Sequence, residues 1–165
     1  MAFVIPDGLH DDVKPLAWLV GKWGGRGHGE WGDQKFSFTQ EVTFRHDGRP
    51  YLEYTSRSWL INEDGSLIKP AAGETGYWKV KPNNVLEVVI AHNLGIVESW
   101  VGQHQGAKIQ LEFDGAALNP SAKHVHGGSR LYGLVEGQLF LAYDMAAMGK
   151  ELQPHVWASL ERQPE

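Results

Sequence analysis

Glycine recurs at every second position in one short segment of this chain, at Gly25, Gly27 and Gly29, shortly after Gly21 and Trp23. In a β-strand alternate residues share one face, so these glycines leave one side of the strand without side chains. Such a strand is costly, because glycine loses the most backbone entropy on folding and packs nothing against its neighbours. We therefore expect a close approach at this bare face, by another backbone, by a bend at a barrel corner or by a bulky flat ligand.

The glycine-rich segment also matches the pattern G-x-G-x-x-G, over residues 27–32. That pattern marks a dinucleotide-binding loop only where a strand precedes it and a helix opens on the last glycine. Here the following residues, from Lys35 to Phe44, alternate with period two and are typical of a strand. The context therefore argues against a nucleotide site.

The rest of the chain is a series of short alternating segments separated by turn signals such as Asp47-Gly48 and Glu136-Gly137. One helix is expected, from His10 to Val20, with Asp11 or Asp12 as its cap. A loop is expected over 69–73. The predicted strands cover residues 21–31, 35–44, 51–62, 74–80, 85–92, 96–104, the alternating residues 109–113, 123–135, 138–148 and 155–162.

About ten strands with tight turns predict an all-β fold, a single antiparallel up-and-down β-barrel with a short N-terminal helix. A sandwich of two sheets is the alternative. We expect one domain over residues 1–165. A barrel of this size is wider than its own side chains easily fill, so an internal ligand cavity is expected.

Composition excludes several classes of function. The net charge of −5 argues against a nucleic-acid or anionic-membrane partner, which would require a concentrated basic face. The chain has no cysteine, and hence no disulfide or thiolate chemistry. The N-terminal residues lack the basic start and apolar core of a signal peptide, and no segment has the length of a membrane span, so a cytoplasmic location is expected.

Histidines are the main candidates for chemistry. None falls in a helical metal-binding pattern. We interpret the pair His124 and His126, and His92 at a turn, as ordinary surface histidines. His155 is more informative, because it opens the last predicted strand directly after Pro154. It shares a strand face with Trp157, and periodicity leaves open whether that face lines the cavity.

Three motifs in order give the chain a family resemblance: Gly21-x-Trp23-x-Gly25-x-Gly27-x-Gly29, Glu74-Thr75-Gly76-Tyr77 and Leu152-Gln153-Pro154-His155. Together they resemble the nitrobindins, small heme-binding β-barrels that are also described as similar to fatty-acid-binding proteins. The resemblance extends from about residue 16 to residue 163, which we expect to be the core of the domain.

The resemblance implies a ten-stranded barrel that holds one heme b per chain, with ferric iron bound axially by the histidine that matches His155. It implies nitric oxide and peroxynitrite as small-molecule ligands, the second being isomerised to nitrate. Lys123, or His124, matches the region that offers a cation to a heme propionate. Two departures are visible: Trp31-Gly32 replaces a usual Tyr-Pro, and Ala72 stands where several relatives carry a distal histidine.

Two other classes of function remain open from the residues alone. The barrel could carry a fatty acid or another apolar ligand without catalysis, or it could be a silent scaffold that binds a partner protein. A homodimer is also conceivable, through exposed aromatic residues of the predicted strands: Trp59, Trp78 and Trp100.

Overall fold

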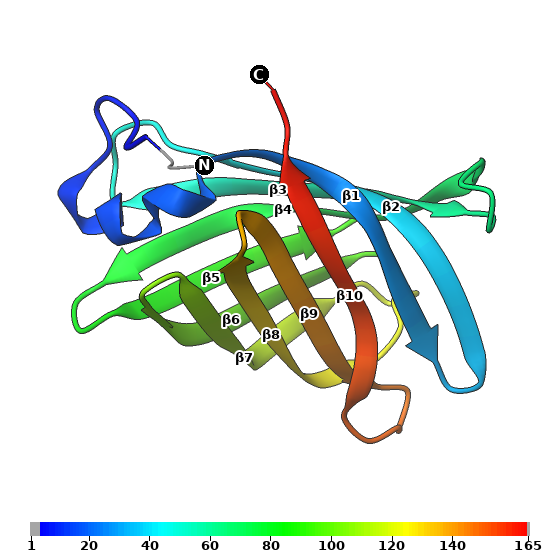
Figure 1. Ribbon diagram of the computed structural model, residues 1–165. Helices are drawn as coiled ribbons and strands as arrows, with labels where there is room; N and C mark the ends of the chain where they lie inside the picture. The colour runs from blue at the N-terminus through cyan, green and yellow to red at the C-terminus, as the bar shows by residue number, and fades with distance from the viewer. Residues whose placement is uncertain (1–3, 165) are drawn as a thin grey trace.

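Ten antiparallel strands form a closed barrel in the computed structural model, which describes residues 4–164 (Figure 1). Each strand pairs with the next along the chain, and the last pairs with the first, which confirms the up-and-down barrel and excludes the sandwich. Residues 1–3 and 165 of the expected domain lie outside the described residues. The strands are β1 Gly21–Trp31, β2 Gln34–Arg45, β3 Tyr51–Ile61, β4 Leu67–Lys81, β5 Val85–His92, β6 Ile96–Gln105, β7 Lys108–Leu118, β8 Val125–Val135, β9 Gln138–Ala147 and β10 Gln153–Arg162.

The two ends of the barrel differ. A 3₁₀ helix, η1 (Asp11–Leu19), lies across one end and buries Val13, Leu16 and Leu19 completely. Its N-cap is His10, whose Nδ1 accepts a hydrogen bond from the Asp12 N–H at 3.1 Å, so the expectation of an aspartate cap was wrong. We call the other end, where β1, β3, β5, β7 and β9 finish, the open end.

Inward-facing side chains follow the expected alternation and are largely aromatic. Phe38, Val42 and Phe44 of β2 are buried, and Trp23, Trp78 and Trp100 are completely buried in the same core. Burial of Trp78 and Trp100 corrects the expectation that they lie on the barrel surface; only Trp59 of that set is partly exposed.

The bare glycine face of β1 is covered by the neighbouring strands. The ring of Phe38 lies against Gly27 and that of Phe36 against Gly29, both from β2. On the other side β10 comes close: a Cβ atom at Gly27 would lie 2.6 Å from the Trp157 carbonyl oxygen, and one at Gly29 would lie 2.9 Å from that of His155. The glycines thus admit two aromatic rings and the backbone of β10.

The expected loop at 69–73 is instead part of β4, which pairs with β3 through two register shifts. Asn93, in the β5–β6 turn, supports this segment: its Oδ1 accepts from the Gly73 N–H at 3.0 Å, and its amide donates to the Ala71 carbonyl at 3.3 Å. This part of the strand contains a proline and pairs with an irregular register, so its sequence does not show the regular alternation that predicts a strand.

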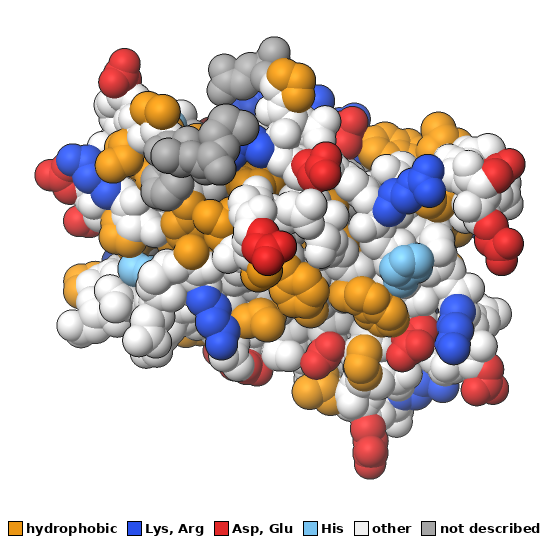
Figure 2. Space-filling model, viewed as in Figure 1, with side chains coloured by type: hydrophobic (Ala, Val, Ile, Leu, Met, Phe, Trp, Pro, Cys, Tyr) orange, Lys and Arg blue, Asp and Glu red, His pale blue; other side chains and the backbone are white. Residues whose placement is uncertain are grey.

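Charged side chains of both signs are interspersed on the face of the molecule drawn in Figure 2, where no area of one sign dominates. No helix among residues 4–164 is long and apolar enough to cross a membrane.

Candidate functional site

A β-bulge at the start of β10 sets the direction of His155. Pro154 pairs with Asp144 and Val156 with Tyr143, so His155 is an extra residue without a partner on β9. Regular alternation would place it on the face of Trp157. The bulge instead brings its ring within 6.1 Å of the centroid of Phe36 and within 5.8 Å of that of Tyr143, two inward-facing rings.

The hydrogen bonding of His155 defines its tautomer. Its Nδ1 lies 3.2 Å from the Glu30 carbonyl oxygen, which can only accept, so Nδ1 carries the proton and Nε2 keeps its lone pair. Burial lowers the pKa of His155 and outweighs the opposing effect of that hydrogen bond. The ring is therefore neutral near pH 7, and its single N–H donates to a backbone carbonyl. The nitrogen of a metal-bound histidine that does not bind the metal typically makes the same kind of hydrogen bond.

An apolar wall adjoins this imidazole. Trp31, at the end of β1, packs edge-on against His155 with ring centroids 5.7 Å apart. It also packs against a small apolar cluster at the open end, made of Ile96, Val125 and Ala147 with Phe113, Ala116, Leu118, Ala122 and Met145 around them. An imidazole nitrogen next to aromatic and aliphatic side chains is suited to bind a metal ion that is itself held in a flat, apolar macrocycle.

The residues predicted to offer a cation to a heme propionate lie at the open end, in the connection before β8. Lys123 and His124 are both exposed there, and the charge of Lys123 contributes to lowering the pKa of His155, so the two residues are electrostatically coupled. The His124 carbonyl accepts from the Met148 N–H at 2.9 Å. Lys150, which sequence reasoning missed, places its ammonium 5.8 Å from the centroid of Trp31.

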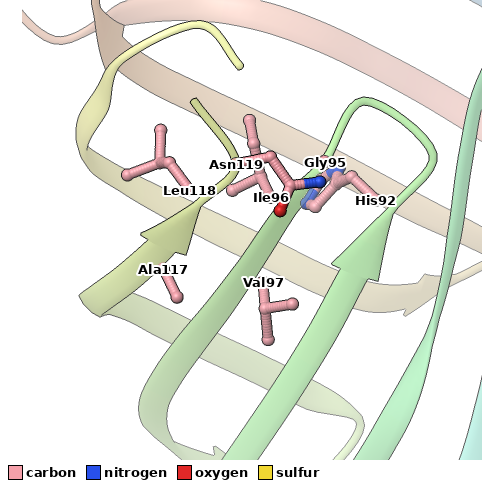
Figure 3. Close-up of a pocket in the computed structure, with 7 residues that line it drawn as sticks. All are labelled: His92, Gly95, Ile96, Val97, Ala117, Leu118 and Asn119. Carbon is pink, nitrogen blue, oxygen red and sulfur yellow. The ribbon is translucent and has the colours of Figure 1, made fainter. Parts of the chain in front are cut away.

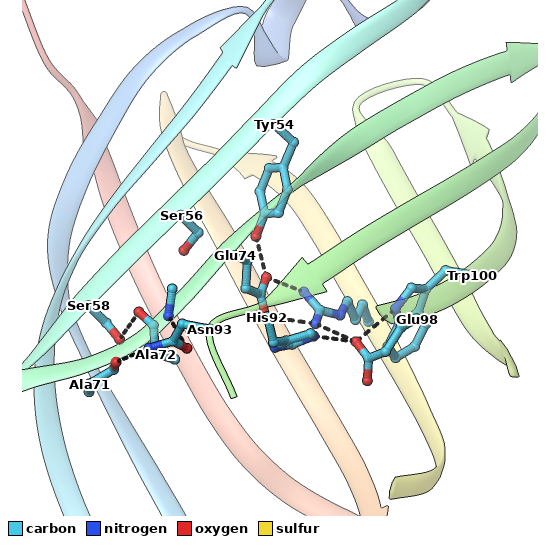
Figure 4. Close-up of polar contacts among 12 residues, drawn as sticks. Tyr54, Ser56, Ser58, Ala71, Ala72, Glu74, His92, Asn93, Glu98 and Trp100 are labelled. Carbon is cyan, nitrogen blue, oxygen red and sulfur yellow. Dashed lines mark hydrogen bonds and ion pairs between the residues drawn. The ribbon is translucent and has the colours of Figure 1, made fainter. Parts of the chain in front are cut away.

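Four charged side chains are buried deeper in the barrel, and we call them the internal charge cluster: Glu74, His92, Glu98 and Arg130 (Figure 4). Both terminal nitrogens of Arg130 donate to Glu74, each at 3.0 Å. His92 is bracketed by carboxylates, with Nε2 2.5 Å from Glu98 and Nδ1 3.4 Å from Glu74. Tyr54 donates to Glu74 at 2.7 Å.

Glu74 and Arg130 form an ion pair. Burial acts to raise the pKa of Glu74, but the adjacent Arg130 guanidinium outweighs it and the pKa falls to about 2. Burial likewise acts to lower the pKa of His92, yet its hydrogen bond to Glu98 and the charge of Glu74 raise it overall. A protonated His92 lies between the Glu74 and Glu98 side chains and can pair with either.

A hollow of about 270 Å³ opens beside this cluster at the open end (Figure 3). His92, the turn residue Gly95 and Asn119 are among its lining residues. Aromatic side chains and the internal charge cluster fill the middle of the barrel, so a ligand as large as heme would have to enter at the open end.

Sequence reasoning missed the internal charge cluster, although a signal for it exists. Glu98 shares strand parity with Ile96 and Trp100, and Glu74 shares it with Trp78. Each carboxylate therefore alternates with large apolar side chains on a strand face that the structure shows to be inward. Ala72, the position at which the family resemblance leads one to expect a distal histidine, is exposed on β4, and its carbonyl accepts from the Ser58 hydroxyl at 3.3 Å.

Comparison with known proteins agrees with this geometry. The model of the THAP4-like, heme-binding β-barrel domain matches residues 12–162. A protein named peroxynitrite isomerase from Nocardioides sp. is 48% identical over 164 residues, which are 99% of this chain and 100% of that protein. A ferric nitrobindin-like protein from Streptomyces griseus is 40% identical over 96% of this chain and 85% of its own length.

A solved structure supports the same assignment. The crystal structure of Rv2717c from M. tuberculosis matches with a TM-score of 0.84 and 36% sequence identity, covering 94% of this chain and 99% of that one. The barrel, the matched residues and the relatives lead to one conclusion: this chain belongs to the THAP4-like heme-binding β-barrel family, the nitrobindins.

Proposed function

We propose that this protein binds one heme b per chain through His155, and that the loaded protein binds nitric oxide and isomerises peroxynitrite to nitrate. Relatives named peroxynitrite isomerase support the reaction, and the family description supports the cofactor. The observation that carries the assignment to this residue is the half-buried, neutral His155, whose Nδ1–H donates to the Glu30 carbonyl and whose Nε2 is unprotonated.

The residues of the open end have distinct roles in this proposal. His155 supplies Nε2 as the axial ligand, and the Glu30 carbonyl fixes the plane of its ring. Trp31, Phe36 and Tyr143 surround the imidazole and keep water from it. Heme supplies a ferric iron with an open coordination position for nitric oxide and peroxynitrite. Lys123 and Lys150 are the cations near enough to this end to pair with propionates.

Titration of the purified apoprotein with ferric hemin tests the assignment. The wild type should give a saturable Soret band at one heme per chain, and the band should shift on addition of nitric oxide. His155→Ala should lose the histidine-ligated spectrum. His28→Ala is the matched control, because His28 is exposed on β1 and contacts the outward Ser37 and Trp157 side chains.

The reaction itself is measured by stopped flow, as the rate of peroxynitrite decay and the yield of nitrate over nitrite. Loaded wild type should accelerate decay and raise the nitrate yield, whereas loaded His155→Ala should not. An unchanged iron spectrum in His155→Ala would overturn the axial assignment. Absence of any specific heme band, with saturable binding of a fluorescent fatty acid, would favour apolar-ligand carriage instead.

A further inference from the structure

Arg130 is an unusual residue for the middle of a barrel, because its side chain is only 4% exposed. Its guanidinium lies over two aromatic rings that stand nearly perpendicular to each other, 4.8 Å from the centroid of Trp100 and 4.4 Å from that of Tyr143. Glu74 holds it with two parallel hydrogen bonds from the opposite wall. Such a bidentate pair fixes the plane of the guanidinium as well as its position.

The strand register connects this guanidinium to the candidate ligand. Arg130 on β8 is the direct partner of Tyr143 on β9, and Tyr143 is the direct partner of Val156 on β10, the residue that follows the bulge. The Tyr143 ring meets His155 edge-on, at 5.8 Å and 87°. Arg130 therefore packs on the Tyr143 ring, and the same ring contacts the imidazole.

Stability alone does not explain the buried ion pair. Replacing such a pair with apolar side chains of similar volume is often neutral or stabilising, because desolvation offsets the attraction between the charges. The Nε–H of Arg130 is moreover buried without a hydrogen-bond partner among the described residues, so the guanidinium is placed at some cost. Its fixed position, on the other hand, is well suited to orienting the ring beside it.

We propose that Arg130 is a positioning residue for His155, acting through Tyr143: Glu74 fixes the guanidinium, the guanidinium fixes the phenol ring, and the ring fixes the imidazole. This inference rests on the proposed role of His155 as the axial ligand. It assigns to the internal charge cluster a part in the geometry of the heme site.

Three variants test the proposal. Arg130→Lys keeps the positive charge but loses the planar, bidentate hydrogen bonding to Glu74. The pair Glu74→Gln with Arg130→Met removes both charges together, so that no carboxylate of this pair is left buried without its cation. Arg162→Met is the matched control, since Arg162 also stacks on a ring, at 4.2 Å from Trp23, but contacts the backbone next to η1.

The first measurement uses the apoprotein and needs no heme. Long-range ¹H–¹⁵N spectra at a pH where His155 is neutral report which nitrogen carries the proton. We expect the wild type and Arg162→Met to show the Nδ1–H form alone, and the two Arg130 variants to show a mixture of tautomers and fewer contacts between Tyr143 and His155. The same spectrum in all four proteins would overturn the proposal.

The second measurement uses the hemin-loaded proteins. Loss of a residue that orients a metal ligand typically costs 10–100-fold in affinity. We expect hemin affinity to fall by about 10-fold or more in both Arg130 variants, and the iron–histidine stretching band of the ferrous form to shift and broaden. Wild type that binds no hemin would refute the proposed function. Wild type that binds through His155, with unaltered bands in the Arg130 variants, would refute the positioning role alone.

Discussion

Replacement of Gly27 by alanine tests whether the glycine stripe is needed for close packing. The new Cβ would lie 2.6 Å from the Trp157 carbonyl oxygen and would also meet the ring of Phe38. The ring can move aside, but the carbonyl belongs to the β1–β10 ladder and cannot yield without disturbing it. We therefore expect Gly27→Ala to destabilise the barrel.

The magnitude follows from two opposing effects. Overpacking of a well-packed site costs about 1–3 kcal/mol. Alanine in place of glycine restricts the unfolded chain and returns about 0.4–1 kcal/mol. With the middle of each range the net loss is about 1.3 kcal/mol, which for a chain of 165 residues lowers Tm by roughly 3–5 °C.

Thermal and urea melts of the apoprotein measure this loss. Gly133→Ala is the control, because the nearest atom to its Cβ is the Ala107 carbonyl oxygen at an ordinary 3.6 Å. The control should melt at or above the wild-type temperature. Adding Phe38→Leu to Gly27→Ala should recover only part of the loss, because the carbonyl contact remains. Equal stability of Gly27→Ala and Gly133→Ala would refute the close-packing argument.

Three further predictions concern the buried charges and η1. Folding raises the pKa of His92, so the stabilisation from its positive charge is fully present below the pKa of the unfolded chain, about 6.5. It is lost as the pH rises through the pKa of the folded protein. In urea melts, the difference in unfolding free energy between the wild type and His92→Gln should therefore shrink over that pH range. Arg130→Met alone leaves the Glu74 carboxylate without its guanidinium and should cost about 3–5 kcal/mol in the free energy of unfolding, and the double variant with Glu74→Gln should cost clearly less. Equal losses would contradict an ionised Glu74–Arg130 pair. Leu16→Ala, at a completely buried position, should cost about 2–5 kcal/mol, and a loss below 1 kcal/mol would show that η1 does not seal the barrel.

Much of the fold was predictable because alternation is a local property. The bounds of β1 and β5 agree with the sequence prediction, and the closing of a ten-stranded meander follows from the number of strands and the short turns. The first part of β4 was missed, since Pro70 and irregular pairing conceal it.

The candidate site was less predictable, for physical reasons. The family motif identifies His155, but strand parity cannot reveal that a bulge turns this side chain inward. In the internal charge cluster, β4, β5 and β6 are already neighbours in the sheet, but Arg130 of β8 reaches Glu74 of β4 only across the interior of the curved barrel. Inward parity of Glu98 would have indicated a buried charge, though not its partners.

Pairing of β10 with β1 has a consequence for the order of assembly. Residues near the two ends of the chain must meet, as Gly29 does with Val156, and contacts of such wide sequence separation form slowly. Until they form, the edge of β1 is open to other chains, a known route to aggregation. Because β10 also carries His155, the proposed heme ligand, a nascent or half-folded chain would lack this ligand at its place in the barrel. Loading with heme would then report that the barrel has finished folding.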